Sequence, residues 1–138
     1  MENISLTPKK QQKLFLLLAI FILSLVTANL LGAKITSAFG VAVSVAIFTY
    51  PLTFTISNII EEVHGKTMAR QFILTGVVVL LALFIIIALS LQLPTAERFA
   101  ERGAAYTTTF QSSLRIIAGS LIAFLLSQAH NIWAFGFW

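Results

Sequence analysis

The amino-acid sequence predicts an all-α, polytopic membrane protein with four transmembrane helices, and three observations support this fold class. Of the 138 residues, 58% are apolar and 10% are charged, whereas soluble domains have about 50% apolar and about 25% charged residues. Three long runs, 14–33, 35–60 and 71–96, contain no Asp, Glu, Lys, Arg or His. Each is long enough for the about 20 residues that a helix needs to cross a bilayer. A fourth run, 112–131, is apolar apart from Arg115, two serines at its start and a scatter of small polar residues.

We expect the spans at about 14–33, 41–62, 71–91 and 112–133, within a single membrane domain that comprises residues 1–138. The first run is longer than the about 7 to 15 residues of a signal-peptide core, so we expect it to remain attached. The third run has Val, Leu, Ile and Phe on every side, which is typical of a helix that faces lipid over most of its circumference. Pro94 ends this run, and a short interfacial helix or loop is expected after it.

Basic residues predict the orientation of the chain in the membrane. Five of them belong to the N-terminal segment and to the connection between the second and third spans, and three lie on the opposite side, which places the N-terminus in the cytoplasm. The five are Lys9, Lys10, Lys13, Lys66 and Arg70, and the three are Lys34, Arg98 and Arg102. Because the basic residues are scattered over segment ends, no nucleic-acid partner is expected. The absence of cysteine excludes disulfides and thiolate chemistry.

The fourth span carries a row of small and polar residues at steps of four. The row consists of Arg115, Gly119, Ala123, Ser127 and Asn131, with Ser112 and Ser120 on the same arc and Leu114, Leu121 and Leu125 opposite. Such a face either packs closely on another helix or lines a cavity. Arg115 leaves two alternatives open, because its side chain can snorkel to the headgroups or serve the cavity.

The second span combines polar and aromatic side chains on one side. Thr49, Thr53, Ser57 and Glu61 form one row at steps of four, and Tyr50, Phe54 and Asn58 fill the adjacent strip. Pro51 removes a backbone donor and is expected to kink the helix at membrane depth, which bilayers tolerate where protein or a cavity satisfies the freed carbonyl. The span is therefore expected to form an inner wall.

Two adjacent glutamates, Glu61 and Glu62, precede the expected helix stop at Gly65. The helix dipole disfavours anions in the last turn by about 0.3 to 1 kcal/mol each. They therefore indicate either an external partner or a salt-bridge cluster with Lys66 and Arg70.

Glu61 and His64 have the spacing of half a di-iron site, but there is one copy of this pair and no aspartate. No metal and no cofactor are expected. No Ser, His and acid constellation resembles a hydrolase, so the chain is not expected to be an enzyme.

Three segments carry a resemblance to a known family. "NLLGAK" (29–34), "FTYPLTFTISNIIEEVHGKTMAR" (48–70) and "SLRIIAGSLIAFLLSQAHNIWAF" (113–135) resemble the queuosine precursor transporter family in order and spacing. These proteins of the bacterial inner membrane are similar to vitamin-uptake transporters. The resemblance implies uptake of 7-deazaguanine bases such as 7-cyano-7-deazaguanine.

The resemblance also implies a substrate site for a purine-like base. A carboxylate can accept adjacent N–H donors in bidentate fashion, and aromatic rings can stack on the base. Glu62 matches the family's glutamate and is expected to bind the donor edge, while Arg115 and Gln128 face the carbonyl side across a central cavity. The full predicted set is Glu62, Asn58, Phe48, Tyr50, Phe54, Arg115, Gln128 and Asn131. Family positions expected to serve packing and topology are Asn29, Lys34, Pro51, Gly65, Arg70 and Ser127.

Some features depart from the family pattern. Asn58 and Asn131 stand where the family has acidic residues, so coupling to protons or cations through those carboxylates is in doubt, and His64 replaces a usual aromatic. The chain also ends after the fourth span, whereas the family has about six or more. The alternative hypothesis is therefore a truncated, transport-incompetent remnant or a helix-packing partner of another membrane protein. Besides the lipid bilayer and the substrate, a second copy is a possible partner, because oligomerisation could complete the cavity.

Overall fold

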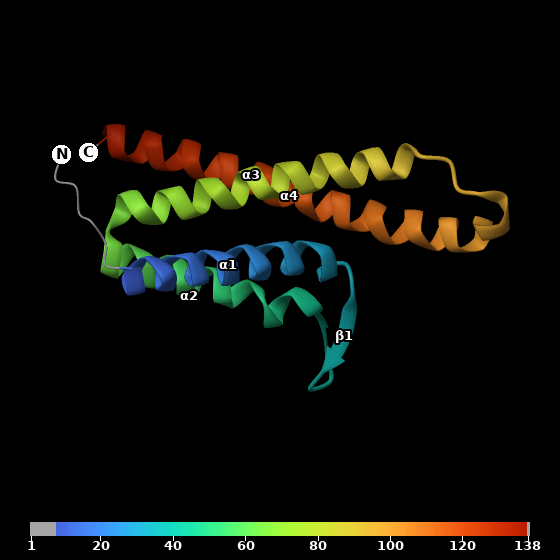
Figure 1. The fold of residues 1–138 in the computed structure, drawn as a ribbon, viewed down its shortest axis with the longest axis horizontal. Helices are drawn as coiled ribbons and strands as arrows, with labels where there is room; N and C mark the ends of the chain where they lie inside the picture. The colour runs from blue at the N-terminus through green and yellow to red at the C-terminus, as the bar shows by residue number, and fades with distance from the viewer. Residues whose placement is uncertain (1–7, 138) are drawn as a thin grey trace.

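The computed structural model describes the backbone of residues 8–137 and the side chains of residues 8–123 and 126. Four α-helices form an up-and-down bundle, and a small β-hairpin projects sideways from it (Figure 1). In chain order the elements are α1 (Pro8–Leu31), β1 (Ile35–Ala38), β2 (Val41–Ser44), the 3-10 helix η1 (Val45–Phe48), α2 (Tyr50–His64), α3 (Lys66–Gln92), the 3-10 helix η2 (Glu97–Phe99) and α4 (Ala100–Phe137).

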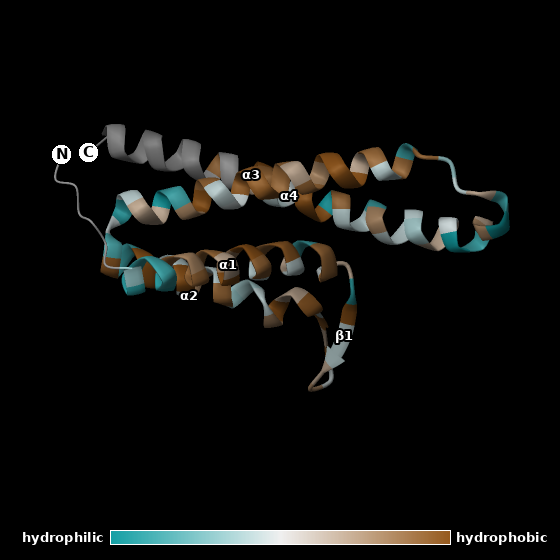
Figure 2. Ribbon diagram, viewed as in Figure 1, coloured by the Kyte–Doolittle hydropathy of each residue, from teal (hydrophilic) through white to brown (hydrophobic). Residues whose placement is uncertain are grey.

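Two of these helices meet the requirements for a membrane span. Among the described residues, α1 with 24 residues and α3 with 27 residues are long and apolar enough to cross a bilayer. Figure 2 shows both helices as mainly hydrophobic along their middle, with hydrophilic residues where each begins. α2 has 15 residues, fewer than the about 20 that a perpendicular span needs. The mostly helical architecture agrees with the predicted fold class, but four spans are not established.

The predicted second span, 41–62, is wrong as a single helix, and no hairpin was expected there. β1 and β2 pair antiparallel with Ala38 opposite Val41, so a two-residue turn joins them. η1 follows, and α2 begins only at Tyr50. Pro51 lies in the first turn of α2, where a missing N–H leaves no gap in the hydrogen-bond ladder. It therefore starts the helix and does not kink it at membrane depth.

The turn between α2 and α3 is very tight. Gly65 ends α2 as predicted, and its N–H donates to the carbonyl of Glu61 at 2.9 Å. Its φ of 83° is a conformation that glycine adopts at no steric cost. α3 begins at the next residue, Lys66, so the two helices form an antiparallel pair with no connecting loop.

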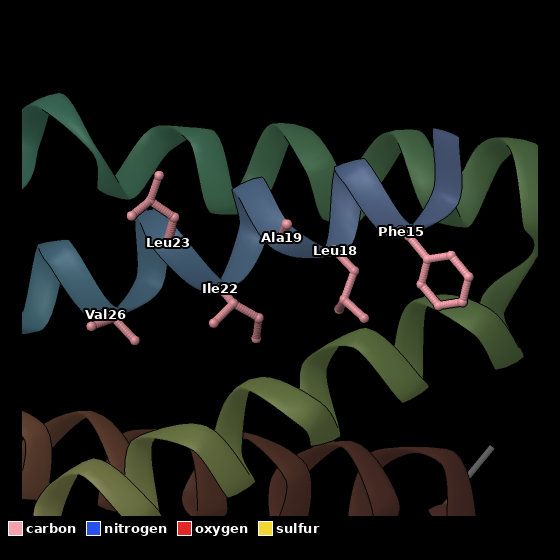
Figure 3. A pocket seen from close by; sticks show the side chains of 6 residues that line it. All are labelled: Phe15, Leu18, Ala19, Ile22, Leu23 and Val26. Atoms are coloured by element: carbon pink, nitrogen blue, oxygen red, sulfur yellow. The ribbon is translucent and has the colours of Figure 1, made fainter. Parts of the chain in front are cut away.

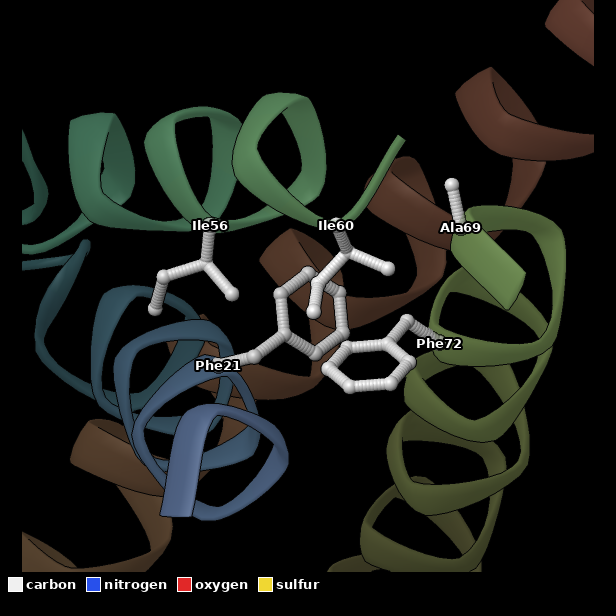
Figure 4. Packing of buried hydrophobic residues seen from close by; sticks show 5 residues of the cluster. All are labelled: Phe21, Ile56, Ile60, Ala69 and Phe72. Atoms are coloured by element: carbon white, nitrogen blue, oxygen red, sulfur yellow. The ribbon is translucent and has the colours of Figure 1, made fainter. Parts of the chain in front are cut away.

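Two hydrophobic clusters hold the bundle together. In the first, Phe21 of α1 meets Ile56 and Ile60 of α2 and Phe72 of α3 (Figure 4). The centroids of the Phe21 and Phe72 rings are 6.1 Å apart. The second cluster joins α3 to α4 through residues that include Ile117, with leucines of α1 packed against it. α2 and α4 thus pack on the same pair of helices, α1 and α3.

α4 begins earlier than predicted, at Ala100 instead of 112. η2 confirms a short helical element before it. The Ser90 and Tyr106 hydroxyls, 3.0 Å apart, join the end of α3 to the start of α4. With 38 residues α4 is about 57 Å long at about 1.5 Å per residue, well over the thickness of a hydrocarbon core. Its first turns therefore extend beyond the level where α1 ends, as Figure 1 shows.

Candidate functional site

One face of α2 carries an open row of aromatic and polar side chains. Tyr50, Phe54, Asn58 and Glu62 follow one another at steps of four, so they lie along one side of the helix. All four are exposed, and so is Phe48 in η1. The Tyr50 and Phe54 rings stand edge to face, with centroids 5.1 Å apart and an interplanar angle of 83°. We call these five residues the α2 face.

The neighbouring row of hydroxyls serves helix packing. Thr53 is buried, while Thr49 and Ser57 are half-buried. The Thr53 hydroxyl donates to the carbonyl of Tyr50 at 2.6 Å, and that of Ser57 donates to the carbonyl of Thr53 at 2.8 Å. Because their hydrogen bonds are satisfied within α2, these side chains are not held open for a ligand. The two rows predicted to share one polar wall therefore separate into a packed face and the open α2 face.

On α4 the side that packs against other helices is not the row of small and polar residues from which packing or a cavity lining was predicted. Arg115, Gly119 and Ala123 are exposed. Ser113 and Ile117 are buried instead, and Leu114 and Leu121 pack against the second cluster. These two leucines are partly buried and fill the space between the helices, and such close packing favours helix association in a membrane.

The structure does not bring Glu62 and Arg115 together. Ile60 packs with Phe21 of α1, and Glu62 lies two residues beyond Ile60, close to the start of α3. Arg115 lies two residues beyond Ser113, whose hydroxyl donates to the Leu30 carbonyl at 3.0 Å near the end of α1. At about 1.5 Å per residue these positions differ by roughly 15 Å along the bundle.

Two members of the predicted set, Gln128 and Asn131, lie outside the described side chains. Their proximity to Glu62 therefore stays a prediction, as does the assignment of the whole set to substrate binding.

Two hollows are present at other places. A groove of about 550 Å³ runs along α1 (Figure 3), and it is lined by Phe15, Leu18, Ala19, Ile22, Leu23 and Val26. A smaller hollow of about 280 Å³ lies at residues 97–102 around η2. Neither has a predicted site residue among the described side chains that line it. The α1 groove has only apolar side chains, so it suits a hydrocarbon chain and offers nothing that would orient a polar base.

A buried polar contact between α1 and α4 was only half anticipated. Asn29 is buried, and its amide donates to the Leu25 carbonyl at 2.9 Å while its oxygen accepts from the Ser120 hydroxyl at 2.8 Å. The resemblance indicated a packing role for Asn29, but its partner on α4 was not predicted. Both ends of the amide are thereby satisfied, which is what burial of a polar group requires.

The pair with metal-ligand spacing offers no complete donor set. Glu61 is exposed, and His64 is half-buried with an Nδ1 atom that finds no hydrogen-bond partner among the described side chains and backbone. Over residues whose side chains the structure describes, no group of three or more His, Cys, Asp or Glu side chains could hold a metal ion. The site chemistry that remains is hydrogen bonding and stacking on the α2 face.

Comparison with known proteins adds one match. A family model described as "Putative vitamin uptake transporter" matches residues 44–138. This range includes the whole α2 face and all of α3 and α4, whereas α1 and the hairpin up to Val43 precede it. Searches of curated proteins and of solved structures each find no match.

Proposed function

The chain belongs to this vitamin-uptake-transporter family, and on that premise we propose that it takes up a 7-deazaguanine base such as 7-cyano-7-deazaguanine. The observation that carries the proposal is the α2 face, on which two aromatic rings, an amide and a carboxylate lie exposed in one row. The role of this family is transport, so we propose a binding and translocation site and no catalytic one.

The chemistry of the α2 face suits a flat heterocycle with adjacent N–H donors. The Glu62 carboxylate can accept two parallel N–H···O bonds from the donor edge. The Asn58 amide, one turn away, offers both a donor and an acceptor. Phe54 lies one further turn along, and an aromatic ring that stacks on a base contributes about 1 to 3 kcal/mol.

The size of a base limits how many of these residues it can touch at once. Successive members of the row rise by about 6 Å, so a base bound at Glu62 reaches Asn58 and Phe54 but not Phe48. We therefore propose that Glu62, Asn58 and Phe54 form the binding position, and that Tyr50 and Phe48 lie farther along the path of the solute. Arg115, Gln128 and Asn131 would contact it at another stage or from another conformation.

The cost of open polar groups in lipid supports a role for this face. Acidic side chains placed in or near the hydrocarbon region cost about 2.5 to 3.5 kcal/mol at the centre of a span and less toward its end. Asn58 and Glu62 are exposed, and this cost applies to Glu62 wherever the end of α2 lies in lipid. A cavity that admits a polar solute gives these groups partners that the described residues do not provide.

We also propose that the protein lies in the bacterial inner membrane with its N-terminus in the cytoplasm. Five basic residues on the N-terminal side against three on the other support this orientation. If an impermeant maleimide labelled a Gln11→Cys variant in intact cells, the N-terminus would lie outside the cytoplasm and the proposed orientation would be wrong.

Uptake of labelled base tests the proposal. Cells unable to make 7-deazaguanine bases are supplied with labelled 7-cyano-7-deazaguanine and with this protein or an empty vector. We expect saturable accumulation that requires the protein and that excess unlabelled base suppresses. If a vitamin accumulates and the base does not, the proposed substrate is wrong, while the proposal that the protein is an uptake transporter stands. If the protein is present in the membrane and neither solute accumulates, the proposed function is wrong.

A further inference from the structure

The β-hairpin carries an aromatic residue in an unusual conformation at its tip. Phe39 and Gly40 form the two-residue turn between β1 and β2, with φ values of 52° and 78°. Two-residue hairpin turns of this kind need positive φ at both positions and favour Asn or Asp followed by Gly. A bulky residue with positive φ is uncommon and raises the conformational energy. Phe39 is nevertheless fully exposed, so no contact within the described residues offsets this cost.

Apolar residues elsewhere in the hairpin and in the following η1 are also uncovered. Ile35, Val41, Ile47 and Phe48 each have more than half of their surface exposed. From Ile35 to Ser44 the hairpin has no charged residue. Soluble proteins blunt exposed strand edges with charges, which this hairpin lacks. It is therefore poorly suited to water.

The hairpin leaves the bundle where the apolar part of α1 ends. Ser44 holds its base to the end of α1, because the Ser44 hydroxyl donates to the Gly32 carbonyl at 2.7 Å. Lys34, exposed at the same place, is the first charged residue after the apolar part of α1. A bilayer positioned on α1 would thus have its surface at the hairpin.

A bilayer positioned on α3 instead of α1 would have the hairpin deeper below its surface. Gly76 of α3 lies against Phe21 and Leu25 of α1, and from there α3 continues to Gln92 while α1 ends at Leu31. α3 therefore extends about 12 Å farther in the same direction. Figure 1 shows the hairpin beside the bundle, short of the end of α3. A bilayer positioned on the apolar run of α3 would have its surface about 10 Å beyond the base of the hairpin.

From these levels we infer that the hairpin is a membrane anchor that inserts Phe39 and its apolar neighbours into the boundary between headgroups and acyl chains. The hydrocarbon core itself is excluded, because a two-stranded hairpin has free backbone groups at both edges. At the boundary, headgroups and water satisfy those edges while the apolar side chains enter the acyl region by about 5 to 10 Å. The partner is the lipid surface, and this inference does not depend on which solute the protein carries.

Single spin labels test the depth of the tip. The chain contains no cysteine, so Phe39→Cys and Val41→Cys can each be labelled without a background in the full-length protein in vesicles. Phe99→Cys is the matched control, because Phe99 is also an exposed aromatic and lies in η2 between Arg98 and Arg102. Collisions of the label with oxygen, which concentrates in lipid, are compared with collisions with a water-soluble nickel chelate.

We expect oxygen to dominate at positions 39 and 41 and the nickel chelate to dominate at position 99. The anchor is disproved if positions 39 and 41 behave like position 99, because the tip would then lie in water. It is equally disproved if the labels at 39 and 41 are shielded from both reagents, because a protein segment or a second copy would then cover the tip. Circular dichroism of each variant verifies that the helical fold is retained.

Discussion

Two asparagines show how the same residue type comes to lie in different surroundings in this chain. Asn29 is buried between α1 and α4, with its amide donating to Leu25 and accepting from Ser120. Asn58 is exposed on the α2 face. In the sequence Asn58 lies beside other polar residues and Asn29 lies in an apolar run, but this difference does not say which of them is buried. The packing of the helices decides which side of each helix meets a neighbour.

Replacing the two asparagines by alanine should separate stability from transport. Asn29→Ala removes the acceptor for the Ser120 hydroxyl, and interhelical hydrogen bonds in membranes contribute about 0.6 to 1.7 kcal/mol. We expect a loss of this size in the free energy of unfolding, measured by denaturation in mixed micelles. Asn58→Ala should leave that free energy nearly unchanged and reduce uptake of the base. Equal destabilisation by both substitutions would contradict the assignment of Asn58 to an open face.

At the scale of elements, the second span shows where sequence patterns mislead. An uninterrupted run without charges from 35 to 60 predicts one long helix, and Pro51 within it predicts a kink. In the structure the same proline begins α2, and the residues before it form a hairpin and η1. Hydropathy reports burial in lipid or protein and carries no information on backbone conformation. It therefore does not distinguish one long kinked helix from a hairpin followed by a shorter helix. The stop at Gly65 was predictable because glycine is the residue that adopts the required positive φ.

The close approach of α1 and α3 gives a prediction at this scale. A Cβ atom at Gly76 would lie 2.8 Å from Leu25 Cδ2 and 3.0 Å from Phe21 Cε1, whereas one at Gly119 would meet no described atom within 4 Å. Gly76→Leu should therefore force the helices apart and reduce the free energy of unfolding by about 1 to 3 kcal/mol. Gly119→Leu is the matched control and should change it little. If both variants denature at the same concentration of denaturant, the packing of α1 on α3 is different from that described.

For the whole molecule, the sequence predicted which segments form apolar helices better than it predicted how these helices pack. The apolar runs 14–33 and 71–91 correspond to α1 and α3, the two helices that, among the described residues, are both long and apolar enough to span a bilayer. The match over residues 44–138 confirms the predicted likeness to vitamin-uptake transporters, whereas the queuosine precursor as substrate stays a prediction. To predict whether Glu62 and Arg115 face one cavity, one must know the level of each residue along the bundle and the rotation of each helix about its axis. These depend on many weak contacts, such as the two hydrophobic clusters, that no local pattern encodes.

The proposed site also defines which part of the molecule must change during transport. The α2 face is exposed along its length, and α2 and α4 both pack on α1 and α3. A base held at Glu62 must be shielded from lipid, so elements that cover the α2 face are needed in the transporting state. The account consequently depends on Glu62 as a ligand of the base and not merely as a charge near the end of α2.

Binding of labelled 7-cyano-7-deazaguanine to the purified protein in lipid vesicles tests this dependence most directly, with Glu62→Gln compared with wild type and with Glu101→Gln. Glu101 lies in the first turn of α4, away from the α2 face, and its substitution removes the same charge. Loss of a hydrogen bond to a charged group is worth about 1.5 to 3 kcal/mol. The account predicts that Glu62→Gln weakens binding by about tenfold to a hundredfold and that Glu101→Gln binds as wild type. Equal binding by all three proteins would contradict it.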